Sequence, residues 1–179
     1  MEKERSAGAV IFRKNKETKY LLLHYELGHW GFPKGNIEAK EKNEDTIKRE
    51  AEEETGLKDI TIIKNFKEKL HYFYMSEIST RKLHALAGNK REISEHAQKP
   101  AVFDKLKGQL TSKEVVFYLA ETKKAKIKLS FEHIGYKWLP FKEALEKLSF
   151  KNSKDILKKA DDFLKRNPRL SDYFSRNSS

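Results

Sequence analysis

Three glutamates, Glu50, Glu53 and Glu54, fall within little more than one turn of a predicted helix, and this spacing constrains the chain more than any other feature. At 100° per residue their side chains share an arc of about 100°. Ile47 and Ala51 lie beside this acidic arc, where they would anchor the helix to a core. The segment therefore predicts a helix at the boundary between core and solvent, with three carboxylates directed to one point.

The limits of this helix can be predicted from its ends. Asn43 is a suitable N-cap, and the acids Glu44 and Asp45 favour the positive first turn. Gly56 follows the last residue of the pattern, Thr55, and glycine readily adopts the left-handed conformation that ends a helix. We therefore expect a helix over residues 43–55.

Three carboxylates this close repel one another, and some would take up protons rather than stay charged together. A hard divalent cation relieves this repulsion, and oxygen ligands on one rigid face suit Mg²⁺ or Mn²⁺. Acids at this spacing are more often simply a solvated surface. The glutamates alone therefore leave a metal site and an exposed face both open.

The remaining pattern indicates an α/β fold. Residues 28–35 are too rich in glycine for regular structure and predict a loop or a tightly kinked strand. β-branched and aromatic runs predict strands, and wider apolar spacing predicts helices. Strands are expected at 6–13, 20–25, 60–74 (one or two strands), 113–121 and 133–139, and helices at 141–148 and 153–164.

A polar segment over about residues 75–112 separates two predicted strands. It holds seven basic and four acidic residues, a net charge of +3, with Phe103 as its only aromatic residue. A loop of this length within a compact domain is usually functional or disordered. We interpret it as a partly helical insertion in a single domain over residues 1–175, followed by a frayed tail at 176–179.

Composition limits the compartment and the partners. The chain of 179 residues has no cysteine, which excludes disulfides and thiolate metal sites and fits a reducing cytoplasm. No apolar run approaches the roughly 18 residues of a membrane span, and residues 1–5 lack the apolar stretch of a secretory signal. The net charge of +11 favours polyanionic partners without separating a nucleotide from RNA, and such charge also serves solubility alone.

The segment from Gly35 to Leu57 resembles the Nudix box, with nine matching positions over 23 residues: Gly35, Glu41, Arg49, Glu50, Ala51, Glu53, Glu54, Gly56 and Leu57. This resemblance implies a Nudix fold, an α/β/α sandwich around a mixed sheet with a loop–helix–loop motif that binds Mg²⁺. It also implies that Glu50, Glu53, Glu54 and the main-chain carbonyl of Gly35 are metal ligands. Arg49 is implied to pair with Glu41 and to orient the helix.

A narrower resemblance extends beyond the box. The stretches GHWGFPKGNIE, TIIKNFKEKLHYFY, KEVVFYLAE and IKLSFEHIGYKWLPFKEAL look like the diadenosine tetraphosphate hydrolase branch of the family. By position, the resemblance implies a further metal-site carboxylate at Glu132, polyphosphate contacts at His29, Lys34 and Lys113, and an adenine-binding aromatic pair at Tyr72 and Tyr136. For His29 and the two tyrosines, ordinary packing stays equally open.

The expected activity is hydrolysis of a phosphoanhydride bond in a nucleoside polyphosphate, with diadenosine tetraphosphate giving ATP and AMP. Glu50, Glu53 and Glu132 are all candidates for the general base, and the sequence does not choose among them. Two alternatives stay open. One is removal of pyrophosphate, or of the cap, from the 5′ end of RNA. The basic insertion could bind the RNA backbone in such an enzyme. The other is a catalytically inactive nucleotide-binding module on the same fold.

Overall fold

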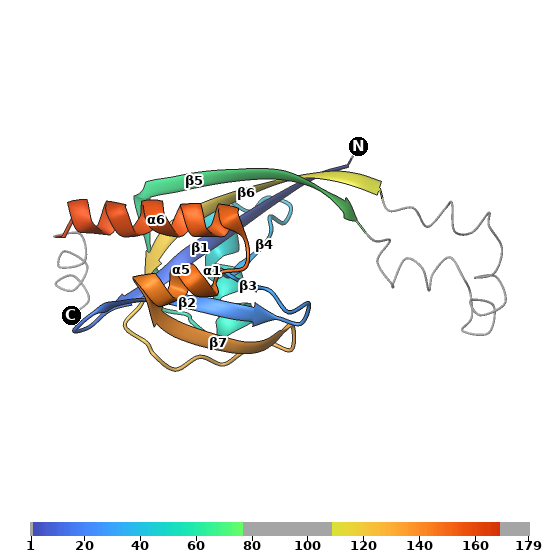
Figure 1. The fold of residues 1–179 in the computed structure, drawn as a ribbon. Helices are drawn as coiled ribbons and strands as arrows, with labels where there is room; N and C mark the ends of the chain where they lie inside the picture. Colours follow the sequence, from blue (N-terminus) through green and yellow to red (C-terminus); the bar gives the residue numbers. More distant parts are fainter. Residues whose placement is uncertain (1, 77–108, 169–179) are drawn as a thin grey trace. The chain divides into compact units, whose positions relative to one another are not determined.

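The computed structural model of the chain describes residues 2–76 and 109–168 (Figure 1). These residues form two compact units. Unit 1 comprises residues 2–4, 71–76 and 109–114, and unit 2 comprises residues 5–70 and 115–168. Most of the predicted insertion at about 75–112 and all of the predicted tail at 176–179 lie outside the described residues. The single domain over residues 1–175 stays a prediction.

The described elements match the predicted ones closely in kind. The strands are β1 (Glu2–Lys14), β2 (Thr18–Tyr25), β3 (Trp30–Gly31), β4 (Lys34–Asn36), β5 (Thr61–Ser76), β6 (Gln109–Glu121) and β7 (His133–Pro140). The helices are α1 (Asn43–Thr55), α5 (Phe141–Lys147) and α6 (Lys151–Arg166). In the part of the chain that the structure describes, no helix is long and apolar enough to cross a membrane.

β1 and β6 both begin four residues earlier than expected, β1 at Glu2 instead of residue 6 and β6 at Gln109 instead of residue 113. In β6 the reason is visible. Two of its early residues, Thr111 and Ser112, are polar but buried. A search for apolar runs therefore misses them, because burial of a hydroxyl depends on a hydrogen-bond partner and not on hydrophobicity. Ser112 has such a partner within unit 1, since its Oγ lies 2.8 Å from Nε2 of His71.

The strands form one mixed sheet in the order β3-β2-β1-β6-β5, with β4 added beside β1 and β7 beside β2. In β4, Gly35 lies opposite Ala7 and Lys34 lies opposite Gly8. β7 runs antiparallel to β2, and the register between them shifts between His24 and Tyr25. The pairing thus brings β4 and β7, which are nearly 100 residues apart in the chain, to neighbouring positions on the β1–β2 pair.

Helices cover both faces of the sheet in unit 2. Because side chains alternate along a strand, the face with Ala7, Ala9 and Ile11 of β1 packs against Ile47 and Ala51 of α1. The opposite face carries Tyr20 and Phe12, and here the Tyr20 hydroxyl donates to Oδ1 of Asp161 in α6 at 2.7 Å. α5 lies beside α6 on this side (Figure 1). The predicted α/β/α sandwich is confirmed.

Helix α1 has the predicted limits but not the predicted N-cap. Its cap is Lys42, which has an extended backbone and donates its amide to Oδ2 of Asp45 at 3.1 Å. The prediction of Asn43 as the cap is therefore wrong by one residue, and the Asn43 carboxamide instead points to the Tyr118 hydroxyl at 3.4 Å. At the other end, Gly56 has the expected left-handed backbone, with a φ of 71°.

Gly8 permits the close approach of β1 and β4. A β-carbon at this position would lie 2.7 Å from the β-carbon of Lys34 and 2.8 Å from a ring carbon of Phe117. Both contacts are shorter than real side chains adopt, so any larger residue would push β4 away. Since β4 carries Lys34 and Gly35, this glycine in the first strand sets the position of the segment that precedes α1.

Candidate functional site

The guanidinium of Arg49 joins the loop before α1 to the acidic side of the helix. Its Nε and Nη2 donate to the two carboxylate oxygens of Glu41 at 2.8 and 3.0 Å, a two-point pairing that fixes its plane. Its Nη2 also donates to the carbonyl of Asn36 at 3.0 Å. Its Nη1 donates to Glu50 at 2.6 Å and to Glu53 at 3.1 Å. The pairing of Arg49 with Glu41 that the family resemblance implies is therefore present.

The contacts of Glu41 predict how the loop responds to acid. The Arg49 guanidinium, followed by the Thr46 hydroxyl, lowers the pKa of Glu41 to about 2. Because this folded-state pKa lies below the unfolded value, the ionised Glu41 stabilises the folded protein. This stabilisation is fully present above about pH 4.5, the ordinary pKa, and is lost as the pH falls toward 2. We expect the difference in unfolding free energy between the native protein and Glu41→Gln to shrink steadily over this range. Chemical denaturation at several pH values measures it, and a difference that does not change with pH would contradict the ion pair.

Gly35 lets the carboxylate of Glu50 lie directly against the backbone of β4. A β-carbon at position 35 would overlap both the carboxyl carbon and an oxygen of Glu50. The Glu50 side chain is largely buried, and burial raises its pKa above the ordinary value although the Arg49 guanidinium lowers it. Gly35 therefore allows the Glu50 carboxylate to lie beside the main-chain carbonyl of Gly35. Both groups are predicted metal ligands.

Glu54 is the most buried acid of the box, with only 4% of its surface exposed. Its Oε2 accepts the amide of Lys34 at 3.1 Å, and its Oε1 lies 3.6 Å from Nε2 of His133. Burial raises the pKa of Glu54 well above its ordinary value, and the nearby charge of Glu50 raises it further. Burial also lowers the pKa of His133 to about 4, so this histidine is neutral at physiological pH.

Glu53 and Glu132 are more exposed than the other two acids. The Glu53 side chain is 58% exposed and accepts from Arg49, whereas Glu132 is an exposed residue of the turn that leads into β7. The charge of Glu132 contributes to the raised pKa values of Glu50 and Glu54, which places these three carboxylates within electrostatic reach of one another. Glu53 lies on the solvent side of the group.

The donor set fits a divalent cation, although the side chains are not yet arranged around one. Within residues 2–76 and 109–168, no three acidic or histidine side chains form a ready group of metal ligands. Arg49 holds Glu50 and Glu53, and Glu54 turns toward the Lys34 amide. Buried carboxylates that resist ionisation would regain their charge beside Mg²⁺, which binds through a few carboxylates and keeps several waters.

The phosphate-binding candidates His29 and Lys34 both contact the ring of Tyr25, a residue that was not among the predicted site residues. The ring of Tyr25 stacks on the imidazole of His29 with centroids 4.4 Å apart. The ammonium of Lys34 lies 5.2 Å from the centroid of the same ring. Burial lowers the pKa of His29, and the Lys34 charge lowers it further. His29 is therefore a neutral hydrogen-bonding group beside a cation.

The remaining candidates are divided between the two units. Tyr136 lies in β7 opposite Leu23 and is 37% exposed, which leaves its ring accessible. Tyr72 and Lys113 belong to unit 1, where Lys113 donates to Glu4 at 3.0 Å and burial raises the pKa of Tyr72. The predicted roles of Tyr72 and Lys113 in substrate binding stay predictions.

Sequence reasoning missed Tyr25 and His133. Tyr25 is the last residue of one predicted strand, and His133 is the first residue of another. The two rings meet edge to face with centroids 4.5 Å apart, although they are more than 100 residues apart in the chain. A pattern along one segment cannot reveal this contact, because it depends on the pairing of β2 with β7.

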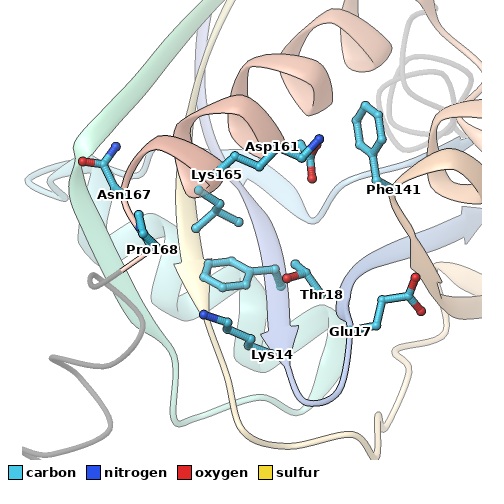
Figure 2. Close-up of a pocket in the computed structure, with 10 residues that line it drawn as sticks. Lys14, Glu17, Thr18, Phe141, Asp161, Lys165, Asn167 and Pro168 are labelled. Carbon is cyan, nitrogen blue, oxygen red and sulfur yellow. The ribbon is translucent and has the colours of Figure 1, made fainter.

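A pocket elsewhere in unit 2 does not contain the candidate residues. It has a volume of about 350 Å³ and lies between the β1–β2 turn and the C-terminal end of α6 (Figure 2). Its buried acid, Asp161, accepts from Tyr20 and pairs with Lys165 at 2.6 Å. The Asp161 carboxylate is therefore already paired, and none of the predicted site residues lines this pocket.

Comparison with known proteins gives a consistent result. A family model described as the NUDIX domain matches residues 2–160. The asymmetrical bis(5′-nucleosyl)-tetraphosphatase of Mus musculus is 31% identical over 173 residues, covering 89% of this chain and 95% of that protein, and the Sus scrofa enzyme of the same name is 30% identical with the same coverage. The crystal structure of a C. elegans Ap4A hydrolase binary complex aligns with a TM-score of 0.66 at 25% identity, covering 90% of this chain and 97% of that one.

Proposed function

Because this chain belongs to the Nudix family and is a hydrolase of phosphorus-containing anhydrides, we propose that its substrate is a dinucleoside polyphosphate, with diadenosine tetraphosphate cleaved to ATP and AMP. The relatives that are named for this substrate match nearly the whole chain. A cytoplasmic location, expected from the absence of cysteine, stays a prediction.

One observation carries the proposal: Glu54 accepts the amide of Lys34, the cation that precedes the box, and Glu50 lies against the next residue, Gly35. The Lys34 amide donates to Glu54, while its ammonium extends toward Tyr25 and His29. An acidic site for metal and a basic site for phosphate thus begin at the same residue. A polyphosphate chain needs both, because its charge must be neutralised along several phosphates at once.

In this proposal Mg²⁺, or Mn²⁺ in its place, would be held by Glu50, Glu53, Glu54, Glu132 and the carbonyl of Gly35. Bound there, the ion supplies charge neutralisation and lowers the pKa of a coordinated water. Arg49 orients the helix that carries three of these acids and keeps Glu50 close to β4. Proton acceptance from the attacking water is assigned to one of three carboxylates, Glu50, Glu53 or Glu132.

The nucleoside would be held by aromatic side chains. Tyr136 offers an accessible ring in β7, and Tyr72 is its predicted partner across the adenine. Stacking on an aromatic ring contributes about 1–3 kcal/mol per base, enough to hold one end of the substrate. His29, Lys34 and Lys113 are the proposed contacts for the phosphates between the two nucleosides.

A product analysis with Mg²⁺ tests this function. Diadenosine tetraphosphate, a nucleoside triphosphate, ADP-ribose and 5′-triphosphorylated RNA are compared by kcat/KM. We expect the first to be preferred by more than about tenfold, which equals about 1.4 kcal/mol of extra transition-state binding. Removal of divalent metal with EDTA should abolish turnover, and Mg²⁺ should restore it.

Two results would contradict the proposal. Preference for triphosphorylated RNA, with activity that falls steeply as salt rises, would instead indicate that the protein's net charge of +11 serves to bind an RNA backbone. Absence of hydrolysis on every substrate, together with measurable nucleotide binding, would indicate a binding module that has lost catalysis.

A further inference from the structure

Tyr25 lies at an irregular position in the sheet. β2 and β7 pair regularly from Lys19 to His24, which lies opposite Gly135. The register then shifts, so that Tyr25 lies opposite His133. A bulge of this kind redirects the side chains beside it and is common next to functional sites. Here it turns Tyr25 and His133 toward each other, with their rings meeting edge to face.

The side chain of Tyr25 contacts three further segments. Its ring stacks on His29 at an interplanar angle of 11°, and the Lys34 ammonium lies over the same ring. Its hydroxyl donates to the carbonyl of Phe32 at 2.8 Å. Tyr25 therefore touches the loop after β2, the link between β3 and β4, and β4 itself. His133, which contacts Tyr25, also lies beside Glu54, so a single side chain separates Tyr25 from Glu54.

We propose that Tyr25 is a positioning residue that holds the ammonium of Lys34 and the imidazole of His29 in the places where they receive the phosphate chain of the substrate. The inference rests on the proposed function, in which Lys34 and His29 bind phosphate. It adds a residue outside the Nudix box that makes these two groups act together.

The chemistry of the three side chains supports this role. A lysine has four rotatable bonds, so its ammonium occupies one place only when another group holds it. The electron-rich face of a tyrosine attracts a cation without neutralising it, unlike a carboxylate, and leaves its charge available to phosphate. The Tyr25 hydroxyl fixes the ring by its bond to Phe32, and the fixed ring orients the imidazole stacked on it.

Kinetics of Tyr25 variants test the proposal. Tyr25→Leu removes the ring and is expected to raise KM about tenfold while kcat changes less than about threefold, since a cation–π contact and a stacked ring are lost before the chemical step. Tyr25→Phe keeps the ring and should stay within about threefold of the native KM. If Tyr25→Leu does not fold, Tyr25→Met replaces it, because methionine is unbranched and flexible, fills irregular space and has no ring.

A double-mutant cycle separates positioning from ordinary packing. In a background that carries Lys34→Met and His29→Ala, the two groups that Tyr25 positions are absent. Tyr25→Leu should then raise KM by less than about twofold, because coupled residues do not add. A packing role would give the same factor in both backgrounds.

Phe66→Leu serves as the matched control. Phe66 is buried in β5 and meets Phe163 edge to face at 5.5 Å, so its replacement also removes an aromatic contact. It should lower the melting temperature with little change in KM. An equal rise in KM for Phe66→Leu and Tyr25→Leu, or full additivity in the cycle, would overturn the proposal. If the enzyme prefers another phosphoanhydride, the cycle is run on that substrate, so failure of the proposed substrate does not decide the role of Tyr25.

Discussion

Glu54→Gln is expected to lower kcat/KM about a thousandfold, equivalent to about 4 kcal/mol of transition-state stabilisation. Glu54 is the most buried acid of the box, and burial together with the charge of Glu50 raises its pKa. Such a group keeps its negative charge only when a cation is bound beside it. Glutamine has the same shape but cannot supply that charge, so the proposed metal-dependent step should be lost.

The same substitution should leave the fold intact. The side-chain carbonyl of a glutamine at position 54 can still accept the Lys34 amide, which now bonds to Oε2 of Glu54. A neutral group also avoids the cost of burying a charge. We therefore expect Glu54→Gln, in the absence of metal, to have a melting temperature equal to or above that of the native protein. The melting temperature and the activity are measured on the same preparation.

Glu52→Gln is the matched control for this prediction. Glu52 lies on the opposite side of α1, where its exposed carboxylate pairs with Lys58 at 3.1 Å. Its replacement removes the same charge from the same helix, and activity should stay within about twofold because exposed ion pairs contribute little. A Glu54→Gln protein with full Mg²⁺-dependent activity would contradict the assignment of Glu54 as a metal ligand.

Local pattern was enough to predict most elements of the fold and the main features of α1. The limits of the helix, the left-handed Gly56 and the burial of Ile47 and Ala51 all follow from spacing within one segment. The pairing of Arg49 with Glu41 came from family resemblance, because a contact between a loop and a helix has no periodicity of its own. The N-cap was displaced by one residue because the Asp45 carboxylate bonds to the amide of Lys42.

Contacts between distant segments could not be predicted in this way. Gly8 is a small residue in an apolar strand, and only its pairing with Lys34 explains why it must be small. Tyr25 and His133 meet because β7 pairs with β2 and shifts register at that point. The sequence thus predicted the groups proposed to carry the chemistry, whereas Gly8, Tyr25 and His133, which lie beside them, could be found only from the pairing of the strands.

Gly35→Ala is expected to lower kcat by about a hundredfold, because a displacement of about 1 Å in a catalytic group has an effect of that size. The added methyl group would overlap the Glu50 carboxylate. Either that carboxylate must turn away from β4, or β4 must shift, and its close contact with Gly8 leaves no space for a shift toward β1. Both responses separate Glu50 from the carbonyl of Gly35 and so disrupt the proposed metal site.

Gly135→Ala tests whether this loss arises from the particular contact at Gly35. Gly135 lies in β7, and a β-carbon there would meet its nearest neighbour, the β-carbon of His24, at an ordinary 3.7 Å. This variant should keep activity within about threefold, since an added methyl group without overlap costs little. If Gly35→Ala also kept near-native kcat, with unchanged Mg²⁺ dependence, Glu50 would not act from its place against β4. The general base would then have to be sought at Glu53 or Glu132, because both lie outside that contact.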